Sequence, residues 1–226
     1  MVCGNGRMMI RFLIGLWILM SSILVHACDF DHQIESIERK IKKSRKILDN
    51  NSLDDVEVVK RHLTIMYAVD QEVRKLFIVF DNPTTRKLLT EVDFFHTEHL
   101  KAILAIHGWI IMSKFGKEAD HQAWLLVQHT DHDPEFQKRC VLLLQHLYPS
   151  GETDKKNYAY LYDRVALKFQ DLGLKQRCGT QAKMIDNKIE LYPFEGSLED
   201  LNQHRHEMDL GPVEDYMETL KTFYKG

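Results

Sequence analysis

The sequence has little glycine, little proline and no strong excess of charge of one sign. It contains 11 glycines and 5 prolines in 226 residues, and its formal net charge is -3. The low glycine and proline content excludes a collagen-like or low-complexity chain. The small acidic net charge excludes a strongly basic nucleic-acid binder, so we expect no nucleic-acid partner. Because 44% of the residues are hydrophobic, the chain is long and apolar enough to fold around a core.

Several motifs that would assign a reaction are also missing. The sequence has no Gly-x-Ser-x-Gly, no His-Glu-x-x-His and no Cys-x-x-Cys. We therefore predict no metal site of these kinds, and the sequence leaves the cofactor unknown. His96 and His99 lie three residues apart in a helical pattern, and we interpret them as ordinary residues of a helix surface.

The N-terminus has the features of a signal peptide. Arg7 and Arg11 precede an apolar run over residues 12–25, and a small residue, Ala27, stands before Cys28. A basic segment, a short apolar segment and a small-residue cleavage site are typical of export signals. We predict a signal peptide over residues 1–27 and an exported protein, located in the periplasm, anchored in a bacterial envelope or secreted.

The cysteines leave two questions open. Cys28 would become the first mature residue, and the preceding residues imperfectly match a lipobox, so lipidation of Cys28 and a membrane anchor are one alternative and a free exported protein is the other. Cys140 and Cys178 would remain in the mature chain, where they either pair or stay as buried thiols.

The rest of the sequence has the periodicity of α-helices. Apolar residues recur at steps of three and four through most of residues 34–169, and Asp70 interrupts one of these stripes. Asn82-Pro83 and Asp133-Pro134 are helix starts, and residues 197–200 resemble a capping box. The one β candidate is a hairpin near residues 175–193, with a turn at Asp186. We predict a mainly α fold, a helical bundle with one small β hairpin, as a single domain over residues 28–226.

A series of polar motifs resembles an uncharacterised bacterial family, domain-of-unknown-function family 6624. The order of the motifs carries the resemblance: Asp70-Gln71-x-x-Arg74, Gly108-Trp109, Gln128-His129-x-Asp131, Phe136-Gln137, Tyr160-Leu161-x-Asp163-Arg164, Gln176-Arg177-x-Gly179-Thr180-Gln181 and His204-Arg205. Ile110, Thr130 and Cys178 depart from the family pattern. The resemblance implies a shared fold and brings no known activity with it.

These motifs supply the candidate site residues. His129 is a candidate general base whose imidazole Asp131 would orient, and Arg164 is a candidate clamp for an anion. The remaining candidates are polar or aromatic side chains at helix ends and beside a glycine turn, suited to hydrogen-bond a ligand: Asp70, Arg74, Trp109, Gln128, Asp163, Gln176, Thr180 and Gln181. The same residues would equally serve as a buried structural network.

Three functions remain open on the sequence alone. The first is a binding module for a small anionic or amide-bearing ligand. The second is a hydrolase or transferase with His129 as general base and Arg164 as anion stabiliser. The third is a structural or interaction lipoprotein without pocket chemistry. The ligand, the presence of catalysis and the oligomeric state do not follow from the sequence.

Overall fold

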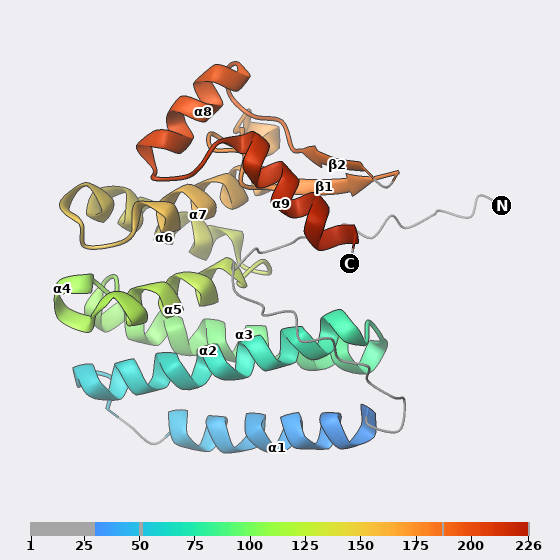
Figure 1. Ribbon diagram of the computed structural model, residues 1–226. Helices are drawn as coiled ribbons and strands as arrows, with labels where there is room; N and C mark the ends of the chain where they lie inside the picture. The colour runs from blue at the N-terminus through green and yellow to red at the C-terminus, as the bar shows by residue number, and fades with distance from the viewer. Residues whose placement is uncertain (1–29, 50–51, 187, 226) are drawn as a thin grey trace. The chain divides into compact units, whose positions relative to one another are not determined.

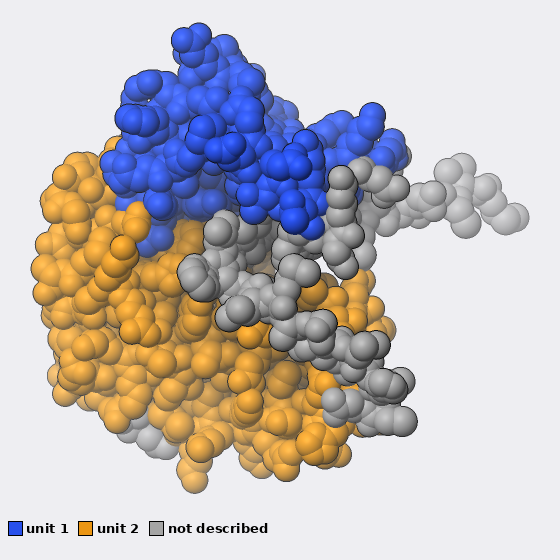
Figure 2. Space-filling view, in the orientation of Figure 1, with its two compact units in different colours: residues 1–14, 155–226 blue, residues 15–154 orange. Residues whose placement is uncertain are grey.

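The computed structural model describes residues 30–49, 52–186 and 188–225, and within them the chain forms two compact units (Figures 1 and 2). Unit 2 contains the described residues up to 154, and unit 1 contains those from 155 onward. The sequence predicted one domain over this range. The predicted signal peptide and Cys28 lie outside the described residues.

In its described residues, unit 2 is built from helices. Its elements are α1 (Phe30–Leu48), α2 (Val56–Val79), α3 (Pro83–His107), α4 (Met112–Phe115), α5 (Lys117–Gln128), α6 (Pro134–Leu147) and the short 3-10 helix η2 (Tyr148–Ser150). Helix α2 contacts α1, α3 and α5, so it is the central element of this unit.

The apolar stripes that the sequence shows are the buried faces of these helices. Ile37 and Ile41 of α1 join one apolar cluster with Val73 of α2 and Val92 of α3. Burial of such side chains is the main favourable term in forming the bundle, at about 25 cal/mol for each Å² of apolar surface. The spacing of three and four therefore arranges these helices around one core.

Side chains at the helix ends explain where α3 and α6 begin. Asn82 accepts hydrogen bonds from the backbone N–H groups of Thr84 and Thr85, and Pro83 occupies the first turn of α3. At the start of α6, Asp133 accepts a hydrogen bond from the backbone N–H of Phe136. Both predicted helix starts are confirmed, because each depends on a local contact that the sequence makes visible.

Unit 1 combines helices with a hairpin. Its elements are α7 (Lys155–Lys168), the 3-10 helix η3 (Gln170–Leu172), β1 (Ala182–Ile185), β2 (Lys188–Leu191), α8 (Leu198–Glu207) and α9 (Val213–Lys225). Strands β1 and β2 are antiparallel, with Ala182 opposite Leu191. Ser197 and Asp200 form the predicted capping box at the start of α8.

The predicted fold class is confirmed: the protein is mainly α with a small β hairpin. One element was not predicted from the sequence, the four-residue helix α4 between Gly108 and Gly116. A single helical turn is too short to produce a periodic apolar pattern. No helix among the described residues is both long and apolar enough to cross a membrane.

Candidate functional site

The polar residue inside the apolar stripe of α2, Asp70, is the centre of a buried network in unit 2. Its side chain is 1% exposed, and it accepts hydrogen bonds from Gln71 Nε2 at 2.9 Å and Arg74 Nε at 3.1 Å. Its Oδ1 also lies 2.8 Å from Nδ1 of His129. A carboxylate taken out of water requires such partners, because an isolated buried charge is very costly.

Arg74 connects Asp70 to a second carboxylate, that of Asp93. Arg74 lies one turn after Asp70 on α2, and its Nη2 donates to Asp93 Oδ1 of α3 at 2.6 Å. The Arg74 side chain is 22% exposed and that of Asp93 is 18% exposed. We call Asp70, Gln71, Arg74, Asp93 and His129 the Asp70 cluster.

His129 enters the cluster from the C-terminal end of α5, where it is the C-cap residue. Its Nδ1 is 2.8 Å from Asp70 Oδ1 and 2.7 Å from Arg74 Nε. One ring nitrogen cannot donate to the first and accept from the second at the same time. We assign the Nδ1 proton to the contact with Asp70, because a carboxylate is the stronger acceptor. In the neutral ring this tautomer makes Nε2 the basic nitrogen.

The two carboxyl groups of the cluster have opposite pKa shifts. Burial alone raises the pKa of Asp70, but the charges of His129 and Arg74 and the hydrogen bonds from His129 and Gln71 outweigh it and hold that pKa well below its usual range. Burial raises the pKa of Asp93 to about 7 against the opposing charge of Arg74, and the charges of Asp70 and Asp131 add to the rise. Asp70 therefore stays ionised near neutral pH, and Asp93 exchanges a proton there.

Burial lowers the pKa of three histidines in unit 2, which are His62 of α2 and His96 and His99 of α3. His96 is 4% exposed, its Nδ1 has no hydrogen-bond partner among the described residues, and burial lowers its pKa to about 4. His62 Nδ1 lies 2.9 Å from His99 Nε2, and burial lowers the pKa of both, that of His99 to about 4. The prediction that His96 is a helix-surface residue is wrong, because it follows Val92 by four residues on the buried face of α3.

The other predicted residues of unit 2 have different surroundings. Trp109 is 2% exposed and its Nε1 donates to Asp120 Oδ1 at 2.7 Å, so its indole is part of the core. Gln128 is buried on α5. Asp131 is half-buried, and its charge contributes to the raised pKa of Asp93. The carboxylate that contacts Nδ1 of His129 belongs to Asp70, whereas the sequence assigned that role to Asp131.

Asp163 of α7 is the centre of a separate network in unit 1. It is fully buried, and its two oxygens accept hydrogen bonds from the backbone N–H groups of Arg177, Cys178 and Thr180 and from the Thr180 hydroxyl, at 2.7–3.2 Å. Burial raises the pKa of Asp163, and these donors oppose the rise. The carboxylate thus anchors the loop of residues 176–181 to α7.

Gln176 and Gln181 hold the same loop closed. Gln176 Nε2 donates to the carbonyl oxygens of Gln181 and Tyr192, and its Oε1 accepts from the Gln181 N–H at 3.0 Å. Gly179 turns the chain with φ of 59°, a value that favours glycine, and a Cβ there would lie 3.0 Å from Leu201. Because these polar groups bind one another, the loop of residues 176–181 is a structural element of unit 1.

The structure thus places seven of the eleven predicted site residues in two clusters. It brings Asp70, Arg74 and His129 together in unit 2, and Asp163, Gln176, Thr180 and Gln181 together in unit 1. Arg164 is buried on α7 of unit 1. Cys140 and Cys178 are both free and buried, and burial raises the pKa of each thiol to about 12. Neither thiol is an activated nucleophile.

Asp93 and His96 are the residues that sequence reasoning missed. They lie three residues apart on α3, beside the apolar positions Val92 and Leu100. A charged residue and a histidine among buried positions were the available signal, because polar groups in an apolar stripe need a partner from elsewhere in the fold. Among the described residues, no group of three or more His, Cys, Asp or Glu side chains is arranged to hold a metal ion.

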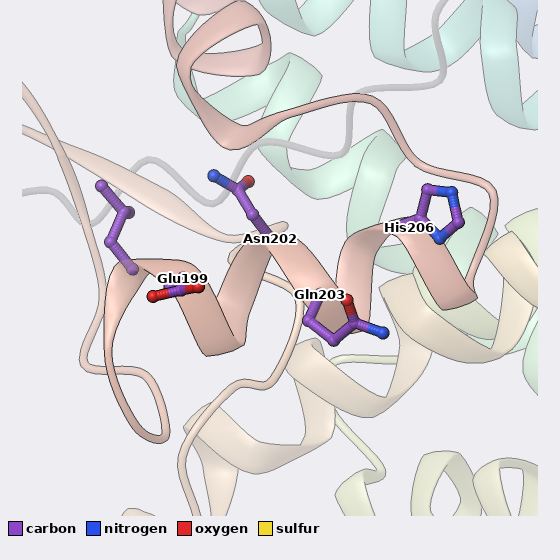
Figure 3. A pocket seen from close by; sticks show the side chains of 5 residues that line it. Glu199, Asn202, Gln203 and His206 are labelled. Carbon is purple, nitrogen blue, oxygen red and sulfur yellow. The ribbon is translucent and has the colours of Figure 1, made fainter.

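A hollow of about 670 Å³ on α8 is not part of either cluster. Its lining comes from one exposed side of this helix, as Figure 3 shows: Leu198, Glu199, Asn202, Gln203 and His206. One lining residue, Asn202, has other contacts in unit 1: its Oδ1 accepts from the Val213 N–H and its Nδ2 donates to Glu214. The hollow contains none of the predicted residues.

Comparison with known proteins identifies a family and no activity. The model of a family described as of unknown function (DUF6624) matches residues 57–225. That range runs from the second residue of α2 to the end of α9 and includes both polar clusters. No curated protein and no solved structure matches the chain.

We expect Asp163→Asn to destabilise the protein, because the amide NH₂ would face backbone N–H groups that now donate hydrogen bonds to the carboxylate. The free energy of unfolding, measured by urea denaturation, should fall by roughly 3 kcal/mol. Asp171→Asn is the matched control, because Asp171 is exposed in the same unit and its replacement should change the stability by less than about 0.5 kcal/mol. Equal stability of the two variants would contradict the anchoring role of Asp163.

Proposed function

The chain belongs to the family of unknown function DUF6624, and from the geometry of its polar residues we propose that the protein is a binding module for a small anionic or amide-bearing ligand. The ligand binds at the Asp70 cluster of unit 2. The observation that carries the proposal is the position of Arg74, whose side chain is 22% exposed and whose guanidinium contacts a buried carboxylate and a buried imidazole.

The cluster has a buried base and a solvent-accessible edge. Asp70 and His129 have side chains only 1% and 3% exposed, whereas Arg74 and Asp93 are 22% and 18% exposed. The buried pair fixes the guanidinium in place, and the outer pair is available to a molecule that arrives from solvent. A guanidinium held in this way binds a carboxylate or phosphate with directional hydrogen bonds, and Gln71 adds an amide group beside it.

We expect Arg74→Gln to weaken binding at least tenfold because the substitution removes the cationic donor. The full chain, labelled with ¹⁵N, is titrated at pH 6 with sodium acetate, inorganic phosphate and acetamide, and the backbone amide shifts give the affinities. Arg86→Gln is the matched control, since Arg86 forms an exposed pair with Asp81 and should bind the probes as the unmodified chain does. Unchanged affinity in Arg74→Gln would contradict the proposed binding site. A lowered melting temperature as the sole effect would favour a structural role for Arg74.

A second candidate, a hydrolase or transferase, is favoured by the contact between Asp70 and His129. A carboxylate at Nδ1 orients the imidazole and fixes the tautomer of a candidate general base. Within unit 2, Arg74 is the guanidinium beside that ring and would stabilise a developing anion, the part that the sequence assigned to Arg164.

The enzyme candidate predicts turnover that depends on His129. Hydrolysis of p-nitrophenyl acetate and p-nitrophenyl phosphate by the full chain is followed by absorbance, and His129→Gln should lower kcat/KM at least a hundredfold. His206→Gln, at an exposed position of α8, is the control and should leave the rate unchanged. Absence of turnover, or a full rate in His129→Gln, rejects this candidate.

We also propose that the protein works outside the cytoplasm. The support is the N-terminal sequence, with Arg7 and Arg11 before an apolar run and Ala27 before Cys28. Mass spectrometry of the protein expressed in a bacterial host distinguishes the alternatives. A chain that begins at acylated Cys28 indicates a lipid anchor, one that begins at unmodified Cys28 indicates a free exported protein, and an uncleaved chain contradicts export.

A further inference from the structure

The two carboxylates that bind Arg74 are held with very different strength. Asp70 accepts from Gln71 and Arg74, contacts His129 and is buried. Among the described residues, the Asp93 carboxylate accepts one hydrogen bond, which comes from Arg74 Nη2. The Asp93 side chain is partly exposed to solvent. Asp93 is therefore the partner of Arg74 that an incoming molecule can displace.

The charges around Asp93 make its ionised form unfavourable without Arg74. Arg74 and Asp70 act on it from α2, Asp131 and the ring of His129 lie at the end of α5, and the neutral His96 follows on α3. Burial and the two neighbouring carboxylates raise the pKa of Asp93 to about 7 in spite of Arg74. Once separated from Arg74, the carboxylate would lose its one favourable charge contact and bind a proton more readily still.

We infer that Asp93 occupies the place of the ligand's anionic group on Arg74, and that a small carboxylate or phosphate binds by displacing it while Asp93 takes up one proton. This inference rests on the proposed function and adds to it the ligand class and its regulation. The Arg74–Asp93 contact breaks, a contact between Arg74 and the ligand oxygen forms, and the proton comes from solvent. A protonated Asp93 no longer repels the anion and gains an O–H donor that faces it.

Binding of the anion should then depend on pH through Asp93. Below about pH 7 the carboxyl is protonated and Arg74 is accessible, whereas above it the ionised Asp93 competes with the ligand. We expect the affinity of the full chain for acetate to fall about tenfold between pH 6 and pH 8. Acetate stays ionised over this range, so the change belongs to the protein.

The decisive experiment compares Asp93→Asn with the unmodified chain in acetate titrations at pH 6, 7 and 8. The amide has the shape of the carboxyl group and carries no charge, so the variant should bind acetate equally at all three pH values and about tenfold tighter than the unmodified chain at pH 8. Asp81→Asn, which removes the carboxylate of an exposed arginine pair, is the control and should keep the pH dependence. Asp93→Ser, which removes the carboxyl group altogether, should also bind independently of pH and serves if Asp93→Asn does not fold.

The outcomes separate this inference from the proposed function. Equal affinities of the unmodified chain at pH 6 and pH 8, or an unchanged pH dependence in Asp93→Asn, overturn the role of Asp93. In that case, binding that still requires Arg74 upholds the proposed function. If neither the unmodified chain nor Asp93→Asn binds acetate or phosphate at pH 6, the inference is wrong, and the proposed function is wrong as well if acetamide does not bind either. A parallel phosphate titration shows which anion the site prefers, and preference for either one supports the inference.

Discussion

The buried carboxylate of Asp70 is the constraint on which the interior of unit 2 depends. It lies in an otherwise apolar stripe of α2, where an unpartnered charge would oppose folding. The fold compensates by bringing Arg74 from one turn further along α2 and His129 from the end of α5 to the same oxygen. Arg74 in turn binds Asp93 of α3, so one charge network connects three helices. The same requirement for partners produces the geometry that the proposed function uses.

Unit 1 solves a similar problem with neutral donors. Asp163 is as deeply buried as Asp70, but its acceptors are filled by backbone N–H groups and one hydroxyl of the loop of residues 176–181. The side chain of Arg205 adds to this closure by donating to the Cys178 carbonyl at 2.7 Å, and the Tyr216 hydroxyl donates to the Thr180 carbonyl. Backbone donors cannot titrate or leave, so this network stabilises a loop. The Asp70 cluster contains a titrating and partly exposed member, and is the better candidate for recognition.

The sequence predicted the helices and the hairpin well because their determinants are local. Asn82 and Asp133 begin helices through contacts two or three residues away, and apolar spacing marks the buried faces. The candidate site was predicted less completely. Asp70, Arg74 and His129 were chosen from ordered motifs, but Asp131 was expected at the imidazole because it is close in sequence, whereas the contacting carboxylate comes from 59 residues away. Sequence separation does not indicate distance once helices pack side by side.

By itself, the sequence determined that this protein is mainly helical, where three of its helices begin, and that Asp70 interrupts an apolar face. Those properties depend on the preferences of each residue and its near neighbours along the chain. Only the tertiary structure decided which polar residues meet. Packing between segments distant in sequence produces three contacts: Asp70 with His129, Arg74 with Asp93, and the loop of residues 176–181 with Asp163. Burial selects these partners, because a charge removed from water is stable only where the fold supplies its counterparts.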